Sequence, residues 1–174
     1  MASVIVQTLK NLTKHNVGSL NQWSKDLLNQ GAKVSGGAID NYCLGTLGFN
    51  ANGERIVSPL ADQTKKGVLV ASVEDYMEEF ESMAQFYNEV GEHARIVYQT
   101  VGHRFEASNF ELADSAKPAK NGQVAHYDIT KKKYIISNGA SNHTDYATAG
   151  NKYVVVNVPD YTLAGLPVIR FEIA

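Results

Sequence analysis

The stretch NGQVAHYDITKKKYIIS, residues 121–137, decides the fold. It holds two runs of β-branched and aromatic residues, 123–128 and 133–137, on either side of the short connection Ile129-Thr130-Lys131. Runs of this composition that flank a turn are typical of two antiparallel strands joined by a tight connection. The stretch therefore predicts a β-hairpin.

The rest of the chain repeats these features. The pair Asn52-Gly53, a strong hairpin signal, follows the apolar segment 38–49. The run Val68-Leu69-Val70-Ala71 has the continuous apolar character of a strand buried on both faces. Further strands are expected at 56–57, 94–100, 103–106, 153–158 and 168–173, with loops at 113–120 and 137–150. Short strands with frequent turns predict a compact β-barrel or sandwich of short antiparallel strands.

One segment, from about residue 73 to 87, has the periodicity of a helix instead. Its apolar side chains recur every three or four residues, at Val73, Tyr76, Met77, Phe80, Met83, Ala84 and Tyr87. Acidic residues occupy the opposite face, at Glu74, Asp75, Glu78, Glu79 and Glu81. The predicted fold class is therefore α+β and β-dominated, with one inserted amphipathic helix.

The first 35 residues differ in composition from the remainder. An Asn-rich polar stretch carries Leu20, Trp23, Leu27 and Leu28 at roughly helical spacing, and glycines at 31, 36 and 37 close it. The segment is either a short amphipathic helix or an arm that buries these side chains against a partner. We expect an N-terminal arm over 1–35 and a β-rich domain over 36–174.

Composition excludes several classes of protein. A chain of 174 residues favours one main domain. A net charge of −2 does not fit a nucleic-acid-binding surface. The single cysteine excludes a disulfide framework within the chain, and no apolar run approaches the length of a membrane helix. The first ten residues do not have the pattern of a signal peptide, so none is expected.

One repeated pattern can be interpreted as a metal site: His126-Tyr127-Asp128 and His143-Thr144-Asp145. Residues two apart on a strand share a face, so each pair could offer an imidazole and a carboxylate to one ion. The structural interpretation is favoured, because Asp128 falls where a turn is expected and turn aspartates bond their own backbone. His143 and Asp145 fall in a loop, where polar residues are common.

Other candidates also have a favoured structural interpretation. Cys43 could be a nucleophile with His15, His93, His103, His126 or His143 as its base, but it lies in an apolar run, where a free cysteine is usually buried. The acidic face of the helix could supply paired carboxylates, but solvent exposure explains it. The basic run 131–133 fits a solvated hairpin tip. We therefore predict no catalytic, cofactor-binding or metal-ligating residues and no enzyme activity.

Four segments resemble the head decoration (cement) proteins and minor capsid structural proteins of tailed bacteriophages: 91–97, 121–128, 131–137 and 168–173. The resemblance covers residues 38–174 and is one of style and order. It implies a non-enzymatic homo-oligomer, with a trimer favoured, that binds the major capsid protein on the outer capsid lattice and stabilises the head. It also implies a location on the capsid surface of the virion, after assembly in the host cytoplasm, with neither nucleic acid nor membrane as a partner.

Two other functions stay open. The chain could be a tail or fibre β module that binds a host receptor or glycan. It could also be a small hydrolase or metal enzyme that uses the two His-x-Asp pairs.

Overall fold

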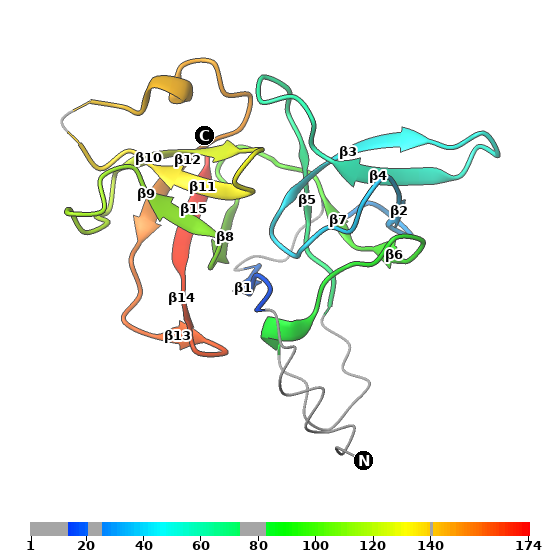
Figure 1. Cartoon of the computed structure of the whole chain (residues 1–174), viewed down its shortest axis with the longest axis horizontal. Helices are drawn as coiled ribbons and strands as arrows, with labels where there is room; N and C mark the ends of the chain where they lie inside the picture. Colours follow the sequence, from blue (N-terminus) through cyan, green and yellow to red (C-terminus); the bar gives the residue numbers. More distant parts are fainter. Residues whose placement is uncertain (1–13, 21–25, 74–82, 140) are drawn as a thin grey trace, which may run out of the picture.

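The computed structural model describes residues 14–20, 26–73, 83–139 and 141–174 (Figure 1). The fold is β-dominated and includes a nearly closed, barrel-like sheet, as the pattern of short strands and turns predicts. Within the described ranges, no helix has the length and apolar character needed to cross a membrane.

Among the described residues, the first sheet has seven strands and contains the hairpin predicted over 123–137. Its order is β1 (Gly18–Ser19), β8 (Arg104–Ala107), β15 (Ile169–Ile173), β12 (Lys152–Asn157), β10 (Val124–Asp128), β11 (Lys133–Ile136) and β9 (Phe110–Leu112). Strands β10 and β11 pair antiparallel, with Tyr127 opposite Tyr134, so the predicted hairpin is confirmed. At the edge, β9 pairs parallel with β11, which differs from the expectation of antiparallel strands alone.

The second sheet has six strands in the described part of the chain, all of them between β1 and β8 in sequence. Its order is β6 (His93–Ala94), β2 (Ala32–Val34), β4 (Arg55–Pro59), β3 (Leu44–Phe49), β5 (Val68–Val70) and β7 (Ile96–Val97). The predicted hairpin at Asn52-Gly53 joins β3 to β4. Strand β2 pairs parallel with β4, a second exception to the antiparallel expectation. A short ribbon of β13 (Thr162–Leu163) and β14 (Leu166–Pro167), not expected from the sequence, precedes β15.

Four aromatic side chains from four strands fill the interior of the first sheet. Phe105, Tyr134, Tyr153 and Phe171 are each at most 1% exposed, and all six pairs of ring centroids lie 4.9 to 6.1 Å apart. Tilted and edge-on contacts of this kind stabilise aromatic clusters beyond the area that they bury. One continuous hydrophobic cluster includes these rings and the buried residues of the second sheet, so the two sheets share a core.

Hydrogen bonds between loops fasten the sheets together. Gln63, in the β4–β5 loop, donates to the carbonyl oxygen of Tyr127 and accepts from the backbone N–H of Ile129. The side chain of Asn151, beside β12, accepts from the N–H of Gly67 and donates to the carbonyl oxygen of Lys65. Both side chains satisfy backbone groups of the other sheet, so these loops act as a joint between the sheets.

The helix predicted over 73–87 lies mostly outside the described residues, because 74–82 are not among them. No α-helix is seen in the described part of the chain. Of its described residues, 73 and 83–87, those at Met83–Gln85 form the 3₁₀ turn η1. Ala84 is buried as expected, but Val73 is 67% exposed and does not belong to a buried stripe. Periodicity alone did not reveal that residues 86 and 87 leave the helical path to form a bridge with Ile39 at Asn88.

Of the segment predicted as an N-terminal arm, the structure describes residues 14–20 and 26–35. They contribute β1 to the first sheet and β2 to the second. Val17 is fully buried, and a Cβ atom at Gly18 would lie 2.1 Å from the carbonyl oxygen of Glu106. Because only glycine permits this approach, residue 18 fixes β1 against β8. The described part of the segment is thus a component of the folded body.

Candidate functional site

His126 lies in β10, near the middle of the first sheet. Its register partners are Ile135 of β11 and Lys152 of β12. Alternation along β10 directs Ala125 and Tyr127 into the shared core and His126 to the opposite face. The loop between β11 and β12 arches over this face (Figure 1), and the His126 side chain is 0% exposed.

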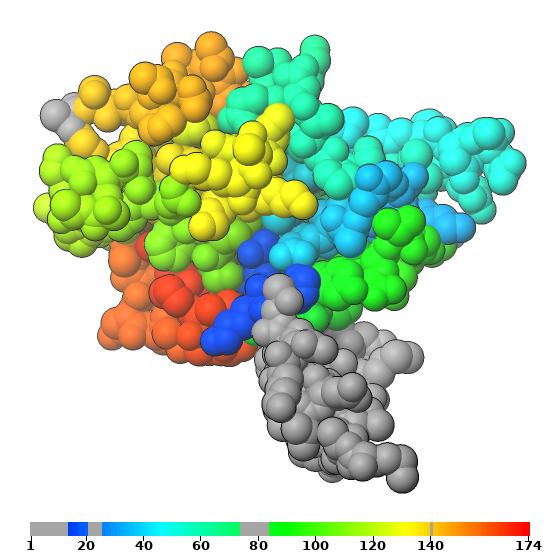
Figure 2. Space-filling view, in the orientation of Figure 1, coloured from blue at the N-terminus to red at the C-terminus, as the bar shows by residue number. Residues whose placement is uncertain are grey.

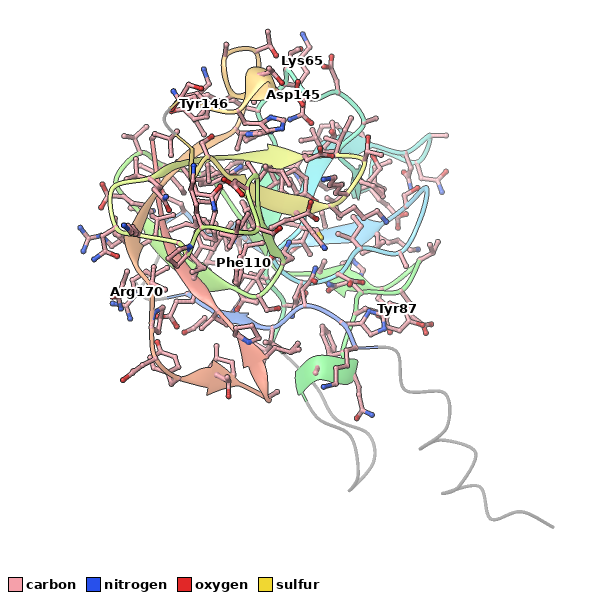
Figure 3. The ribbon with its side chains drawn as sticks, turned by 60° about the vertical axis from the view of Figure 1, so that its left-hand side comes forward. Lys65, Tyr87, Phe110, Asp145, Tyr146 and Arg170 are labelled. Atoms are coloured by element: carbon pink, nitrogen blue, oxygen red, sulfur yellow. The ribbon has the colours of Figure 1, made fainter. Side chains whose placement is uncertain are left out.

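The same loop brings a second histidine and an aspartate to His126. His143 caps the 3₁₀ turn η2 (Thr144–Tyr146): its Nδ1 accepts a hydrogen bond from the backbone N–H of Asp145 over 3.3 Å. The rings of His126 and His143 stack with their centroids 5.1 Å apart. One imidazole nitrogen of each histidine and one carboxylate oxygen of Asp145 lie within 4.8 Å of one another. Asp145 and Tyr146 are labelled in Figure 3, at the upper edge of the molecule in that view.

The His126 imidazole is unusual for a buried polar side chain, both in its hydrogen bonding and in its pKa. Among the described residues, neither Nδ1 nor Nε2 has a hydrogen-bond partner. Leaving a buried polar group unpaired costs about 1–3 kcal/mol. Burial, with a smaller contribution from His143, lowers the pKa of His126 below 6.5. The imidazole is therefore neutral at pH 7 and carries a free lone pair.

Asp128, the remaining residue of the two His-x-Asp pairs, does not lie with His126, His143 and Asp145. Its Oδ1 accepts hydrogen bonds from the backbone N–H groups of Thr130 and Lys131, over 2.8 and 2.9 Å. This is the turn role that the structural interpretation predicted. The structure thus brings together His126, His143 and Asp145, whereas Asp128 organises the β10–β11 turn.

Cys43 is buried, as the apolar run around it predicts. Burial raises the pKa of its thiol to about 11, so the thiol is protonated at neutral pH. Two of the histidines considered as its base pair with aspartates instead: His15 with Asp40 and His103 with Asp26, each over 3.0 Å. This arrangement does not activate a nucleophile, because a thiolate is needed for attack.

The sequence also suggested two charged groups, the basic run 131–133 and the acidic face of the predicted helix. Lys131 and Lys133 form ion pairs with Glu111, over 2.6 and 3.3 Å, so part of the basic run is neutralised at the hairpin. The acidic residues of the predicted helix, 74–81, lie outside the described residues.

Two features of the structure were not predicted from the sequence. The outer half of the β3–β4 hairpin projects beyond its sheet, as the cyan segment shows in Figure 2, and Phe49 at its end is 64% exposed. Elsewhere, the buried carboxylate of Glu106 accepts hydrogen bonds from Arg170 and Tyr161. The exposure of Phe49 and the pairing of Glu106 with Arg170 both depend on how strands from distant parts of the chain align. The composition of the sequence does not specify this alignment.

Comparison with known proteins gives the origin of the chain. Residues 11–174 match the family described as "YonC prophage protein". The chain is also 44% identical, over 178 aligned positions, to the SPbeta prophage-derived uncharacterized protein YonC of Bacillus subtilis (strain 168); the alignment covers 99% of this chain and 98% of that protein. No solved structure matches the chain. These matches confirm the phage origin that the resemblance implied, but they do not show a role in the capsid or in any other part of the phage. The chain belongs to the YonC family of prophage proteins.

Proposed function

We propose that this prophage protein is a structural, non-enzymatic component of the phage head, a capsid decoration (cement) protein. In this proposal it binds the major capsid protein on the outer lattice as a homo-oligomer, with a trimer favoured. It is assembled in the host cytoplasm and resides on the capsid surface. Membership of a prophage family supports the phage context, and the resemblance of the β segments to decoration proteins supports the role in the head.

The projecting β3–β4 hairpin is the observation that carries the proposal. Strand β2 pairs with β4 only at Ile56 and Val57, and β5 pairs with β3 only at Leu44 and Gly45. Within the described residues, the part of the hairpin beyond these positions therefore has strand neighbours only in itself. A two-stranded ribbon is marginally stable in water on its own, so a surface that packs against it would stabilise it.

The tip of the hairpin has the chemistry of a protein contact. Phe49 is exposed, and the guanidinium of Arg55 lies 4.9 Å from the centre of its ring. Aromatic and arginine side chains are enriched at the centres of protein interfaces. Burying a phenylalanine side chain contributes about 1.5–3 kcal/mol, and a capsid lattice repeats this contribution at every copy.

The direct experiment locates the chain in the phage particle. Particles made with and without the gene are purified, their proteins are measured by mass spectrometry, and the chain is located by cryo-EM. We expect a stoichiometric protein on the capsid surface and saturable rebinding of the purified chain to particles that lack it. Absence from purified particles would overturn the proposal, and density on the tail would favour the tail or fibre module instead.

A matched pair of variants tests the hairpin itself. Phe49→Ser should weaken rebinding to capsids, whereas Val101→Ser, at a position that is equally exposed (66%) but outside the hairpin, should not. If Phe49→Ser instead disrupts the oligomer in analytical ultracentrifugation, the hairpin is the contact between copies rather than with the capsid.

A further inference from the structure

We propose that His126, His143 and Asp145 form a binding site for a divalent first-row transition metal ion, with Zn²⁺ the best fit, which clamps the β11–β12 loop onto the first sheet. This site is independent of the capsid contact proposed above, and it reverses the expectation from the sequence that no residue binds a metal.

The buried histidine is the first observation. The His126 side chain is fully buried and stacks on His143, and both of its nitrogens are unpaired among the described residues. Buried polar atoms in native proteins are almost always satisfied, and an unsatisfied one calls for an explanation such as a bound ion. A coordinate bond to a metal ion would satisfy one of these nitrogens.

The donor set selects the class of metal. Two imidazole nitrogens and one carboxylate suit Zn²⁺ and its first-row neighbours, whereas Ca²⁺ and Mg²⁺ take oxygen ligands. Three ligands from the protein leave a fourth tetrahedral position for water. The side chains of His143 and Asp145 are 34% and 54% exposed, so solvent has access to the site.

The spacing of the donor atoms is close to that of a bound state. On a tetrahedral ion with bonds of about 2.0–2.1 Å, the ligand atoms lie roughly 3.3 Å apart. The three donors here lie within 4.8 Å of one another, so an approach of at most about 1.5 Å brings them to that spacing. His126 is fixed in a central strand, while His143 and Asp145 lie on a short turn in a loop, where rotation of two side chains supplies the movement.

The charges around the site are compatible with a cation. Asp145 contributes a negative charge to the ligand set, and Asp128 lies on the same face of β10. Lys152, a register partner of His126, carries the opposite charge. Its ammonium group is bound to the carbonyl oxygen of Ala147 over 3.1 Å and lies 5.1 Å from the centre of the Tyr146 ring. The cation of the lysine is thus engaged by the loop and can remain there when a metal binds.

The test measures binding of Zn²⁺ alone to the full chain after dialysis against EDTA. We expect isothermal titration calorimetry to give one ion per chain and a rise in the melting temperature on addition of Zn²⁺. Co²⁺ in place of Zn²⁺ should give the visible absorption of a tetrahedral site with nitrogen ligands.

Variants on the exposed loop keep the test independent of folding. His143→Gln and Asp145→Asn should weaken Zn²⁺ binding by more than about 10-fold, since even changes next to metal ligands cost 10–100-fold. The control is His103→Gln, which alters another His–Asp pair, with Asp26 3.0 Å away, and should bind like the parent chain. His126→Gln removes the buried ligand and should likewise weaken Zn²⁺ binding, with circular dichroism to confirm that the variant is folded. Absence of saturable binding to the parent chain, or binding that survives both loop variants, would overturn the proposal.

Discussion

The hydroxyl group of Tyr134 donates a hydrogen bond to the backbone carbonyl oxygen of Tyr42 over 2.8 Å, and this bond ties the aromatic interior of the first sheet to the second. Tyr42 has a left-handed backbone, with φ of 62°, a conformation that non-glycine residues adopt rarely. The side chain of Asn109 donates to the same carbonyl oxygen over 3.1 Å. Side chains from the first sheet and its β8–β9 turn therefore stabilise the unusual backbone conformation that precedes β3 of the second sheet.

Tyr134→Phe removes this hydrogen bond and leaves the ring in place. We expect the free energy of unfolding to fall by about 1 kcal/mol, because one buried hydrogen bond is lost while Asn109 still binds the carbonyl oxygen. Urea denaturation measures the change. Tyr98→Phe, at a tyrosine that is 40% exposed, is the control and should be close to neutral. Equal effects of the two changes would mean that the bond to Tyr42 contributes nothing to stability.

The thiol of Cys43 makes the stability of the protein depend on alkaline pH. In the unfolded chain the thiol loses its proton near pH 9, whereas in the folded chain burial raises its pKa to about 11. The folded state therefore binds the extra proton between these values, and the stability that this provides is present below pH 9 and is lost as the pH rises to 11. The loss amounts to roughly 2–3 kcal/mol, at about 1.4 kcal/mol for each pH unit.

Cys43→Ala isolates this contribution. Urea midpoints measured from pH 8 to 11 should fall less steeply for the variant than for the parent chain. A residual slope is expected in both proteins, because burial also raises the pKa of Tyr127, Tyr134 and Tyr153. Identical slopes would contradict the assignment to Cys43. The native thiol should also resist alkylation at pH 8 until the chain is unfolded.

Glu106 is a second buried group whose replacement has a defined effect. Its Oε1 accepts from the Arg170 guanidinium over 2.9 and 2.6 Å and from the Tyr161 hydroxyl over 2.5 Å. Glu106→Gln should lower the free energy of unfolding by about 1.5–3 kcal/mol, since charge-assisted hydrogen bonds to a buried carboxylate are lost. Glu172→Gln, which removes the exposed pair with Arg104, should cost less than about 1 kcal/mol. Thermal and urea denaturation compare the two variants, and equal losses would contradict the role of burial.

Gly18 tests the attachment of β1. Gly18→Ala places a methyl group against the carbonyl oxygen of Glu106 and the ring of Tyr42. We expect a loss of about 1–3 kcal/mol, the usual cost of overpacking, together with faster amide hydrogen exchange at residues 17–19. Gly48→Ala, whose new methyl group would lie 3.8 Å from Ile56, is the control. Unchanged exchange in Gly18→Ala would mean that β1 accommodates the extra group.

Local signals predicted the local part of the fold. The hairpins at 123–137 and at Asn52-Gly53 were predictable because each pairs residues that are close in sequence across a turn with its own chemistry. The parallel pairs and the insertion of β1 beside β8 were not predictable, because they join segments far apart in the chain. Positive φ at Tyr42 was hidden for the same reason: the side chains that hold its carbonyl oxygen come from the other sheet.

The sequence identified the residues of the candidate metal site, but it did not predict which of them lie together in space. The repeated His-x-Asp pattern named all three of its members, but period-2 spacing also placed Asp128 among them. Only the structure separates the aspartate that organises a turn from the one that a loop carries to His126. The projecting Phe49 was not singled out, because the extent to which a hairpin is covered depends on where its neighbouring strands end.

The path of the chain between the sheets has a consequence for folding kinetics. Among the described strands, the first (β1) and the last (β15) belong to the same sheet, and the backbone N–H of Val17, next to β1, donates a hydrogen bond to Oγ of Ser108, 91 positions away. The loop closed by this contact contains every strand of the second sheet. A nascent chain therefore cannot pair β1 with β8 until more than half of its length has been synthesised, and it cannot complete the first sheet until β15 (Ile169–Ile173) has been made. This high contact order favours slow folding, on the millisecond-to-second scale that is typical of all-β proteins, so the fold is completed only after the last strand, β15, is released.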